Sequence, residues 1–176
     1  MPTKKNAAWA EIVQLIPIVT LALPFIVRGS VDLSQASTGF MVGAALAVPI
    51  TALVVAKKEL LNPILMGTNV WLWLGALAFA VPIEALAQSL VATQAFGLFV
   101  AAFAAGLVTT WWSPHGYVAC RSAQPRWTMR ASLALLALTA VAVVWAWLWR
   151  DDIRLGGGLP FIVLNVARRG ACLRAP

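Results

Sequence analysis

The feature that most constrains this chain is a long apolar run from Ile64 to Trp112, in which Glu84 is the single charged residue. A membrane-spanning helix needs about 20 predominantly apolar residues. The run is therefore too long for one span and long enough for two. It predicts two transmembrane helices joined by a tight turn, and the polar pair Gln88-Ser89, near the midpoint, is the expected turn.

The composition of the whole chain supports the same class of protein. Hydrophobic residues make up 61% of the chain and charged residues 11%, whereas a soluble domain carries about 25% charged residues. A chain this apolar has too little polar surface to cover itself in water. We therefore expect an all-α, polytopic integral membrane bundle that forms a single domain.

Apolar runs divide the domain 1–176 into six expected segments. Five are long enough to span a bilayer, whereas the sixth, as a helix, would reach roughly 20 Å against a hydrocarbon core of roughly 30 Å. No A-x-A cleavage site follows the first segment, so we interpret it as an uncleaved helix and not as a signal peptide. The expected bounds are approximately 9–27, 38–56, 64–87, 89–112, 129–149 and 155–167.

The distribution of basic residues predicts the orientation, because Lys and Arg accumulate on the cytoplasmic side of a membrane. If the short sixth segment crosses, the arginines of the tail 168–176 lie on the same side as Lys4 and Lys5. We therefore expect six crossings in a bacterial inner membrane, with both termini cytoplasmic. In this arrangement residues 113–128 form a cytoplasmic loop and residues 168–176 a basic cytoplasmic tail.

The net charge of +7 is explained by contact with anionic lipid headgroups. No surface that interleaves basic and aromatic residues is left over, so the charge does not indicate nucleic acid. The expected partners are the bilayer and either other membrane subunits or a second copy of the chain. The residues expected at the headgroups are Lys57, Lys58, Arg121, Arg126, Arg130, Arg168 and Arg169.

The two cysteines and the single histidine carry little expected chemistry. Cys120 and Cys172 lie near arginines in segments assigned to the cytoplasmic side, where thiols stay reduced, so no disulfide is expected. With His115 as the single histidine, neither a zinc site nor a bis-histidine haem is expected, and no cofactor is predicted. The Ser-Pro-His-Gly sequence at 113–116, with proline second and glycine fourth, predicts a turn.

Glu84 is the candidate polar site within the membrane. Gln88 follows it one helical turn later, and Thr93 and Gln94 begin the returning helix. One interpretation is a carboxylate near the outer interface within a small polar cluster; the other is a proton- or cation-binding group that faces a cavity. Kinks would suit the second interpretation, and prolines fall inside apolar segments at Pro17, Pro24, Pro49, Pro82 and Pro160.

Small residues recur at four-residue steps on two expected helices, a pattern that lets helix backbones approach closely in lipid. They predict packing seams, either within the bundle or with a partner chain. A separate glycine run at 155–158 lacks the lysine-serine ending of a phosphate loop. We interpret it as a flexible connection that leads into the last segment. The seam residues are Gly39, Gly43, Ala47, Gly97, Ala101 and Ala105.

The layout, with short helices, a basic turn (AKKELLNP, 56–63) and a basic loop after the fourth segment, resembles that of small polytopic bacterial inner-membrane proteins, including the intracellular septation protein A type. No H-E-x-x-H, G-x-S-x-G or Ser/His/Asp set is present, so we do not expect an enzyme. The seams favour a structural or accessory subunit that acts by helix packing. The alternative is a small proton- or ion-coupled carrier or channel that uses Glu84 and the proline-kinked helices.

Overall fold

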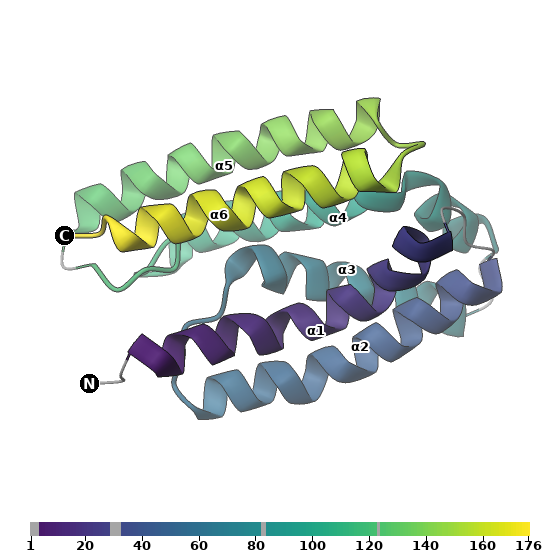
Figure 1. Ribbon diagram of the computed structural model, residues 1–176, viewed down its shortest axis with the longest axis horizontal. Coiled ribbons are helices and arrows are strands. Elements are labelled where there is room, and N and C mark those ends of the chain that lie inside the picture. The colour runs from purple at the N-terminus through teal and green to yellow at the C-terminus, as the bar shows by residue number, and fades with distance from the viewer. Residues whose placement is uncertain (1–3, 29–32, 82–83, 123) are drawn as a thin grey trace.

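The computed structural model describes residues 4–28, 33–81, 84–122 and 124–176. Helices account for 84% of the chain, and no strand occurs in these ranges, so the predicted all-α fold is confirmed. Figure 1 shows the elements in chain order: α1 (Lys4–Arg28), α2 (Leu33–Ala56), α3 (Pro63–Ala80), α4 (Glu84–Trp112), α5 (Pro125–Leu148), the π-helix η1 (Arg154–Gly158) and α6 (Leu159–Leu173).

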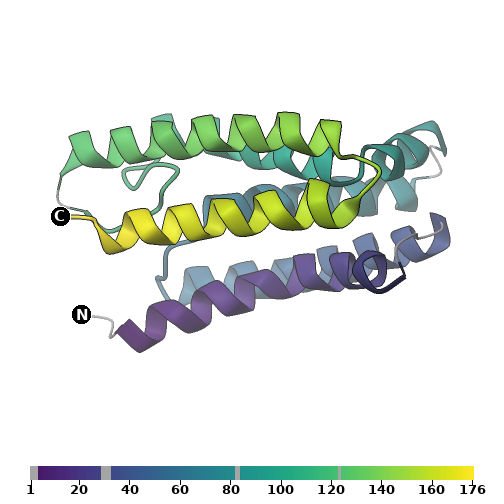
Figure 2. The same cartoon turned by 45° about the horizontal axis from the view of Figure 1, so that its top comes forward.

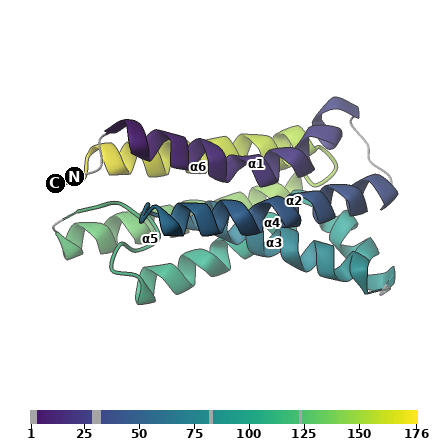
Figure 3. The same cartoon turned by 90° about the horizontal axis from the view of Figure 1, so that it is seen from below.

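The helices lie along one long axis, and both chain termini are at the same end of the bundle, which we call the termini end (Figures 1 and 2). Each helix packs against its neighbours in the chain, most extensively α3 against α4. In addition, α1 reaches α3, whereas α6 packs on α5. Figure 3 shows α1 and α6 on the same side of the bundle.

Many large apolar side chains lie on the outer surface of the bundle. Residues such as Val141 and Leu148 of α5 expose most of their side chains, as expected where lipid replaces water. These properties support a multi-pass membrane protein, while the count of five or six crossings stays a prediction. The helices long and apolar enough to span are Ser34–Ala56, Pro63–Ala80, Ala95–Trp112 and Pro125–Leu148, and α1 has a shorter apolar part, Trp9–Leu23.

The third and fourth helices meet earlier in the chain than the sequence predicts. Because α3 ends at Ala80 and α4 begins at Glu84, the predicted turn at Gln88-Ser89 is wrong. The sequence between the two helices contains Pro82, which lacks the N–H that a continuing helix would need. Ser89 lies within α4, where its hydroxyl donates to the Leu86 carbonyl at 2.8 Å, so this polar side chain is satisfied inside a helix.

Prolines mark two helix starts at the termini end. The side chain of Asn62 caps α3 by accepting a hydrogen bond from the Ile64 N–H at 3.1 Å, and Pro63 occupies the first turn. Both residue types are typical of these positions. Pro125 begins α5, so this helix starts before the predicted boundary at residue 129.

The segment after α4 contains the predicted turn but does not spread over the surface. The Gly116 N–H donates to the Ser113 carbonyl at 3.0 Å, and Gly116 has a positive φ of 59° that glycine adopts without strain. Residues 116–120 are then buried, and the Val118 N–H donates to the Ser132 hydroxyl of α5 at 3.2 Å. The expected loop 113–128 is therefore partly inserted into the bundle.

The last helix extends beyond its predicted end. α6 continues to Leu173, so most of the expected tail 168–176 is helical. The glycine run at 155–158 is also helical, as η1, and leads directly into α6. The helix continues past the apolar segment because Arg168, at the start of the expected tail, is buried against another helix.

The small residues of α2 lie at contacts inside the bundle. A side chain added at Gly39 would meet Leu21 of α1, and one added at Gly43 would meet Leu72 of α3 at 3.0 Å. Ala47 on the same face is completely buried. These contacts lie within one chain, so the close approach of α2 to α1 and α3 accounts for this seam.

The small residues of α4 serve the packing of α4 against α3. A side chain at Gly97 would overlap the ring of Trp71, and the backbone at Ala101 lies close to Gly67 of α3. Ala105 is also buried. Both predicted seams thus take part in internal packing, where the absence of bulky side chains brings backbones together.

Candidate functional site

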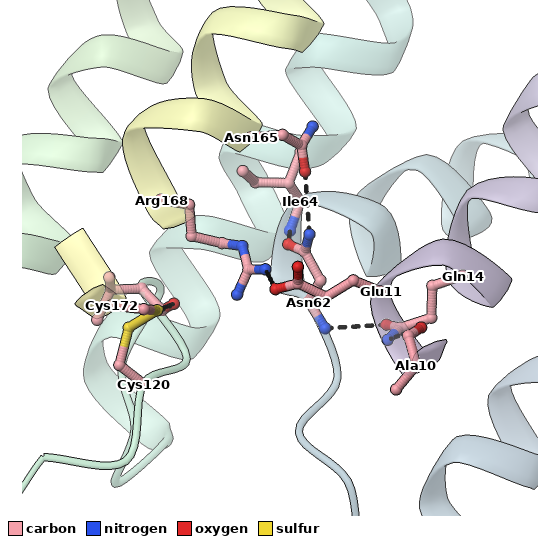
Figure 4. A network of polar contacts seen from close by, with 10 residues as sticks. Ala10, Glu11, Gln14, Asn62, Ile64, Cys120, Asn165, Arg168 and Cys172 are labelled. Carbon is pink, nitrogen blue, oxygen red and sulfur yellow. Dashed lines mark hydrogen bonds and ion pairs between the residues drawn. A yellow bond between two sulfur atoms is a disulfide. The ribbon is translucent and has the colours of Figure 1, made fainter. Parts of the chain in front are cut away.

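A group of polar side chains from three parts of the chain lies in the half of the bundle nearer the termini end. This polar cluster consists of Glu11 and Gln14 of α1, Asn62 before α3, and Asn165 and Arg168 of α6. Figure 4 shows these side chains directed toward one another. Polar groups amid apolar helices are costly unless they are paired, so their partners decide what the cluster does.

Asn62 is at the centre of the polar cluster. Its backbone N–H donates to Oε1 of Gln14 at 2.9 Å, and its Nδ2 donates to Oδ1 of Asn165 at 3.1 Å (Figure 4). The two outer amides also bond within their own helices, Gln14 to the Ala10 carbonyl and Asn165 to the Phe161 carbonyl, both at 2.9 Å. The cluster therefore links the start of α3 to α1 through a buried hydrogen bond and to α6 through a partly buried one.

Arg168 and Glu11 complete the cluster as an ion pair between Nη2 and Oε1. The Arg168 side chain is 6% exposed and that of Glu11 37%, so the arginine depends on this partner more than the carboxylate does. Its Nε is buried without a hydrogen-bond partner. The prediction that Arg168 contacts lipid headgroups is therefore wrong, because the longer α6 turns this residue toward α1.

A disulfide between Cys120 and Cys172 closes the same end of the bundle (Figure 4). The Cα atoms are 5.3 Å apart, within the range that the bond requires. The expectation of two reduced thiols is wrong for this structure, because it followed from the expected compartment and not from geometry. The inserted segment 116–120 and the last turn of α6 bring the two sulfur atoms together.

Tyr117 anchors the inserted segment. Its hydroxyl lies 3.1 Å from the Thr139 hydroxyl of α5, and the side chain is completely buried. Burial raises the pKa of Tyr117 to about 12, although the hydrogen bond with the Thr139 hydroxyl acts in the opposite direction. The neutral phenol is therefore the form that fits this site.

The other half of the bundle contains an apolar cavity of about 600 Å³ between α1, α4 and the η1–α6 segment. Helices α2 and α3 also contribute a side chain each. Among the described residues that line it, Arg154 is the single charged one. Representative lining residues are Val19, Trp71, Leu98, Arg154, Leu159 and Ile162.

The apolar cavity reaches the outside of the bundle between α1 and α6. Val19, Leu159 and Ile162 line it and are also exposed on the surface. The two helices pack on different partners, α1 on α2 and α6 on α5. The polar cluster joins them toward the termini end, whereas the cavity separates them farther along.

The structure describes the predicted Glu84 site in part. Glu84 is the first residue of α4, with Gln88 exposed one turn later and the Thr93 hydroxyl bonded to the Leu90 carbonyl at 3.2 Å. The side chains of Glu84 and Gln94, like residue Pro82, lie outside the described part of the chain. A helix N-terminus favours a carboxylate, which agrees with a structural position for Glu84.

The predicted basic residues gather at the termini end. Arg126, Arg130 and Arg169 are exposed there. Arg121 donates to the Lys58 carbonyl at 3.1 Å and lies 4.0 Å from Glu59. The remaining predicted residue, Lys57, is also exposed. This one-sided charge matches the pattern from which orientation was predicted, and the side of the membrane stays a prediction.

The sequence contained signals for the polar cluster that pattern analysis did not use. Gln14, like Glu11, is a polar residue within the first apolar segment, and Asn165 interrupts the last one. Asn62 precedes a proline, as helix-capping residues do. The sequence does not indicate which of these residues pair with one another, because they lie in segments far apart in the chain. In the described ranges, no group of three or more His, Cys, Asp or Glu side chains is arranged to hold a metal ion.

Comparisons of the chain with protein-family models, with curated proteins and with solved structures find no match.

Proposed function

We propose that this chain is a non-enzymatic, membrane-embedded binding protein that takes a hydrocarbon chain from the bilayer into the apolar cavity. The observation that carries this proposal is a cavity of about 600 Å³ with an apolar lining that reaches the surface between α1 and α6. Ligand pockets in proteins typically measure about 300–1,000 Å³, so the space suits one molecule.

The route into the cavity also supports this proposal. Exposed Val19 and Ile162 stand at its edge on two helices that pack on different neighbours. A chain that enters between them breaks none of the hydrogen bonds of the polar cluster, which lies nearer the other end. Lipid is the solvent at such an edge, so an acyl or alkyl chain is the natural occupant.

This proposal changes the weight of the two hypotheses drawn from the sequence. The accessory-subunit hypothesis relied on packing seams, and these take part in contacts within the chain. The carrier hypothesis gains a cavity that opens toward the surface, but this cavity is lined by apolar side chains and suits a lipid-like cargo better than a proton or an ion. A binding protein, with or without transport, accommodates both observations.

Photolabelling with a long-chain fatty alcohol that carries a diazirine tests the proposal. In detergent or nanodiscs, we expect labels on residues of α1, α4 and α6 that line the cavity, such as Val19, Leu98 and Leu159. Uniform labelling of lipid-facing residues on α5, such as Leu133 and Val144, would contradict a specific cavity.

A matched pair of glycines supplies the control. Gly158 lines the cavity, and a Cβ added at Gly158 or at Gly170 has no atom within 4 Å beyond its own turn of helix. Gly158→Leu should therefore fill the space without disturbing the fold and abolish cavity labelling, while Gly170→Leu should leave labelling unchanged. Equal labelling in both variants would refute occupation of the cavity.

A further inference from the structure

Arg154 is placed where an amphipathic ligand would present its headgroup. It is the first residue of η1, at the end of the bundle away from the chain termini. Arg154 is among the residues that line the apolar cavity, and it is exposed. An arginine stem can lie along an apolar surface while its guanidinium stays at the polar boundary.

We infer that the occupant of the cavity is an anionic lipid, whose phosphate headgroup is bound by Arg154 while its chain lies between α1 and α6. This inference rests on the proposed function and names the class of ligand. Arginine suits the role because its planar guanidinium binds phosphate through two parallel hydrogen bonds. Its five N–H donors also allow it to keep contacts within the protein.

The backbone around Arg154 is held in place by hydrogen bonds. Oδ1 of Asp152 accepts from the N–H groups of Arg154 at 2.9 Å and Leu155 at 3.1 Å. On the other side of the turn, the Trp145 indole donates to the Leu155 carbonyl at 2.9 Å. The arginine is thus presented from a fixed turn, which lowers the ordering cost of binding a headgroup.

Other charged residues of this turn do not share the position of Arg154. Asp151 and Asp152 are exposed and are not among the residues that line the cavity. Arg150 lies with its guanidinium carbon 5.0 Å from the centre of the Trp147 ring and also does not line it. Arg150 has the same charge at the same end of the bundle, so it is a matched control for Arg154.

The experiment compares two photoreactive probes with the same diazirine-bearing chain, one an alkyl phosphate and the other the alcohol. In the full-length protein in nanodiscs of zwitterionic lipid, we expect the phosphate probe to label the cavity about tenfold more efficiently, as one charge-assisted hydrogen bond allows. Arg154→Gln should remove this preference and leave alcohol labelling intact. Arg150→Gln should keep the preference.

The outcomes separate the two proposals. Equal labelling by both probes, or an unchanged preference in Arg154→Gln, overturns the headgroup assignment even if Gly158→Leu still blocks the alcohol probe. Loss of preference in both arginine variants also overturns it, because general surface charge would then explain the effect. If Gly158→Leu blocks neither probe, the proposed function itself fails.

An excess of inorganic phosphate provides the last arm of the test. We expect it to leave labelling by the alkyl phosphate unchanged, because the chain contributes to binding as well as the headgroup. Competition by free phosphate at concentrations similar to that of the probe would overturn the assignment of a lipid and indicate a soluble anion instead.

Discussion

The ion pair between Glu11 and Arg168 should stabilise the bundle far more than the ion pair between Glu59 and Arg121. Removing one partner of a buried pair costs about 3–5 kcal/mol, because the remaining charge is left buried and unpaired. Arg168 is 6% exposed, but Glu11 is 37% exposed and partly screened. We therefore expect Glu11→Gln to cost about 3 kcal/mol, at the lower end of that range.

The Glu59–Arg121 pair provides the matched control. Its atoms are 4.0 Å apart and the Arg121 side chain is 49% exposed, so Glu59→Gln should cost less than about 1 kcal/mol. The free energy of unfolding is measurable in mixed micelles by titrating a denaturing detergent and following tryptophan fluorescence. Equal costs for the two glutamate variants would refute the argument from burial.

A double variant separates the ion pair from the packing of its side chains. Arg168→Met removes the buried charge and keeps an unbranched apolar side chain. In the Glu11→Gln background this second change should recover much of the lost stability, because no unpaired charge remains. If the costs of the two single variants simply add, the residues are not coupled and the pair does not join α1 to α6.

Three further predictions concern the rest of the fold. Burial raises the pKa of Tyr117 to about 12, so the neutral phenol should contribute its full stabilisation below the ordinary pKa near 10. This stabilisation should be lost as the pH rises toward 12. An absorbance titration of the single tyrosine measures its pKa in the folded protein. Gly67→Ala should cost up to about 3 kcal/mol in the same unfolding assay, because the added carbon would overlap the backbone of α4, while Gly170→Ala should be nearly neutral. Since the structure joins Cys120 to Cys172, a maleimide gel shift on protein from growing cells should find both sulfur atoms unreactive until a reductant is added. Free thiols before reduction would contradict the disulfide and would agree with a reducing, cytoplasmic side at the termini end.

Apolar run length predicted the helical architecture well, because that property determines whether a segment can cross lipid. It placed α2 and α5 close to their observed positions. It failed at the boundary between α3 and α4, where polarity favoured Gln88-Ser89 and the observed helix ends lie on either side of Pro82. Backbone chemistry decided that boundary, since proline removes a donor, whereas Ser89 finds a partner within the helix.

The site was less predictable than the fold. Glu84 is a candidate site because it is the single charged residue in a long apolar run. The absence of other charges nearby does not indicate whether a residue lies inside a helix or begins one. Arg168 was assigned to a tail because it follows an apolar segment and has a basic neighbour. Its partner Glu11 lies near the other end of the chain, and pairing over such a separation depends on tertiary packing that local patterns do not contain.

Between α1 and α6, the polar cluster occupies the half nearer the termini end and the apolar cavity occupies the other half, and this difference suggests what controls binding. Moving a hydrocarbon chain from the bilayer into an apolar cavity brings little hydrophobic gain, because lipid tails are as apolar as the lining. Occupation must therefore depend on close packing, and preference for one lipid over another on a polar contact at the headgroup. Among the described residues that line the cavity, Arg154 is the charged one placed to supply that contact. The polar cluster lies nearer the termini end, where it links the helices. Under the proposed function, a headgroup contact at one end of the bundle and fixed helices at the other would select a lipid by its charge as well as by its chain.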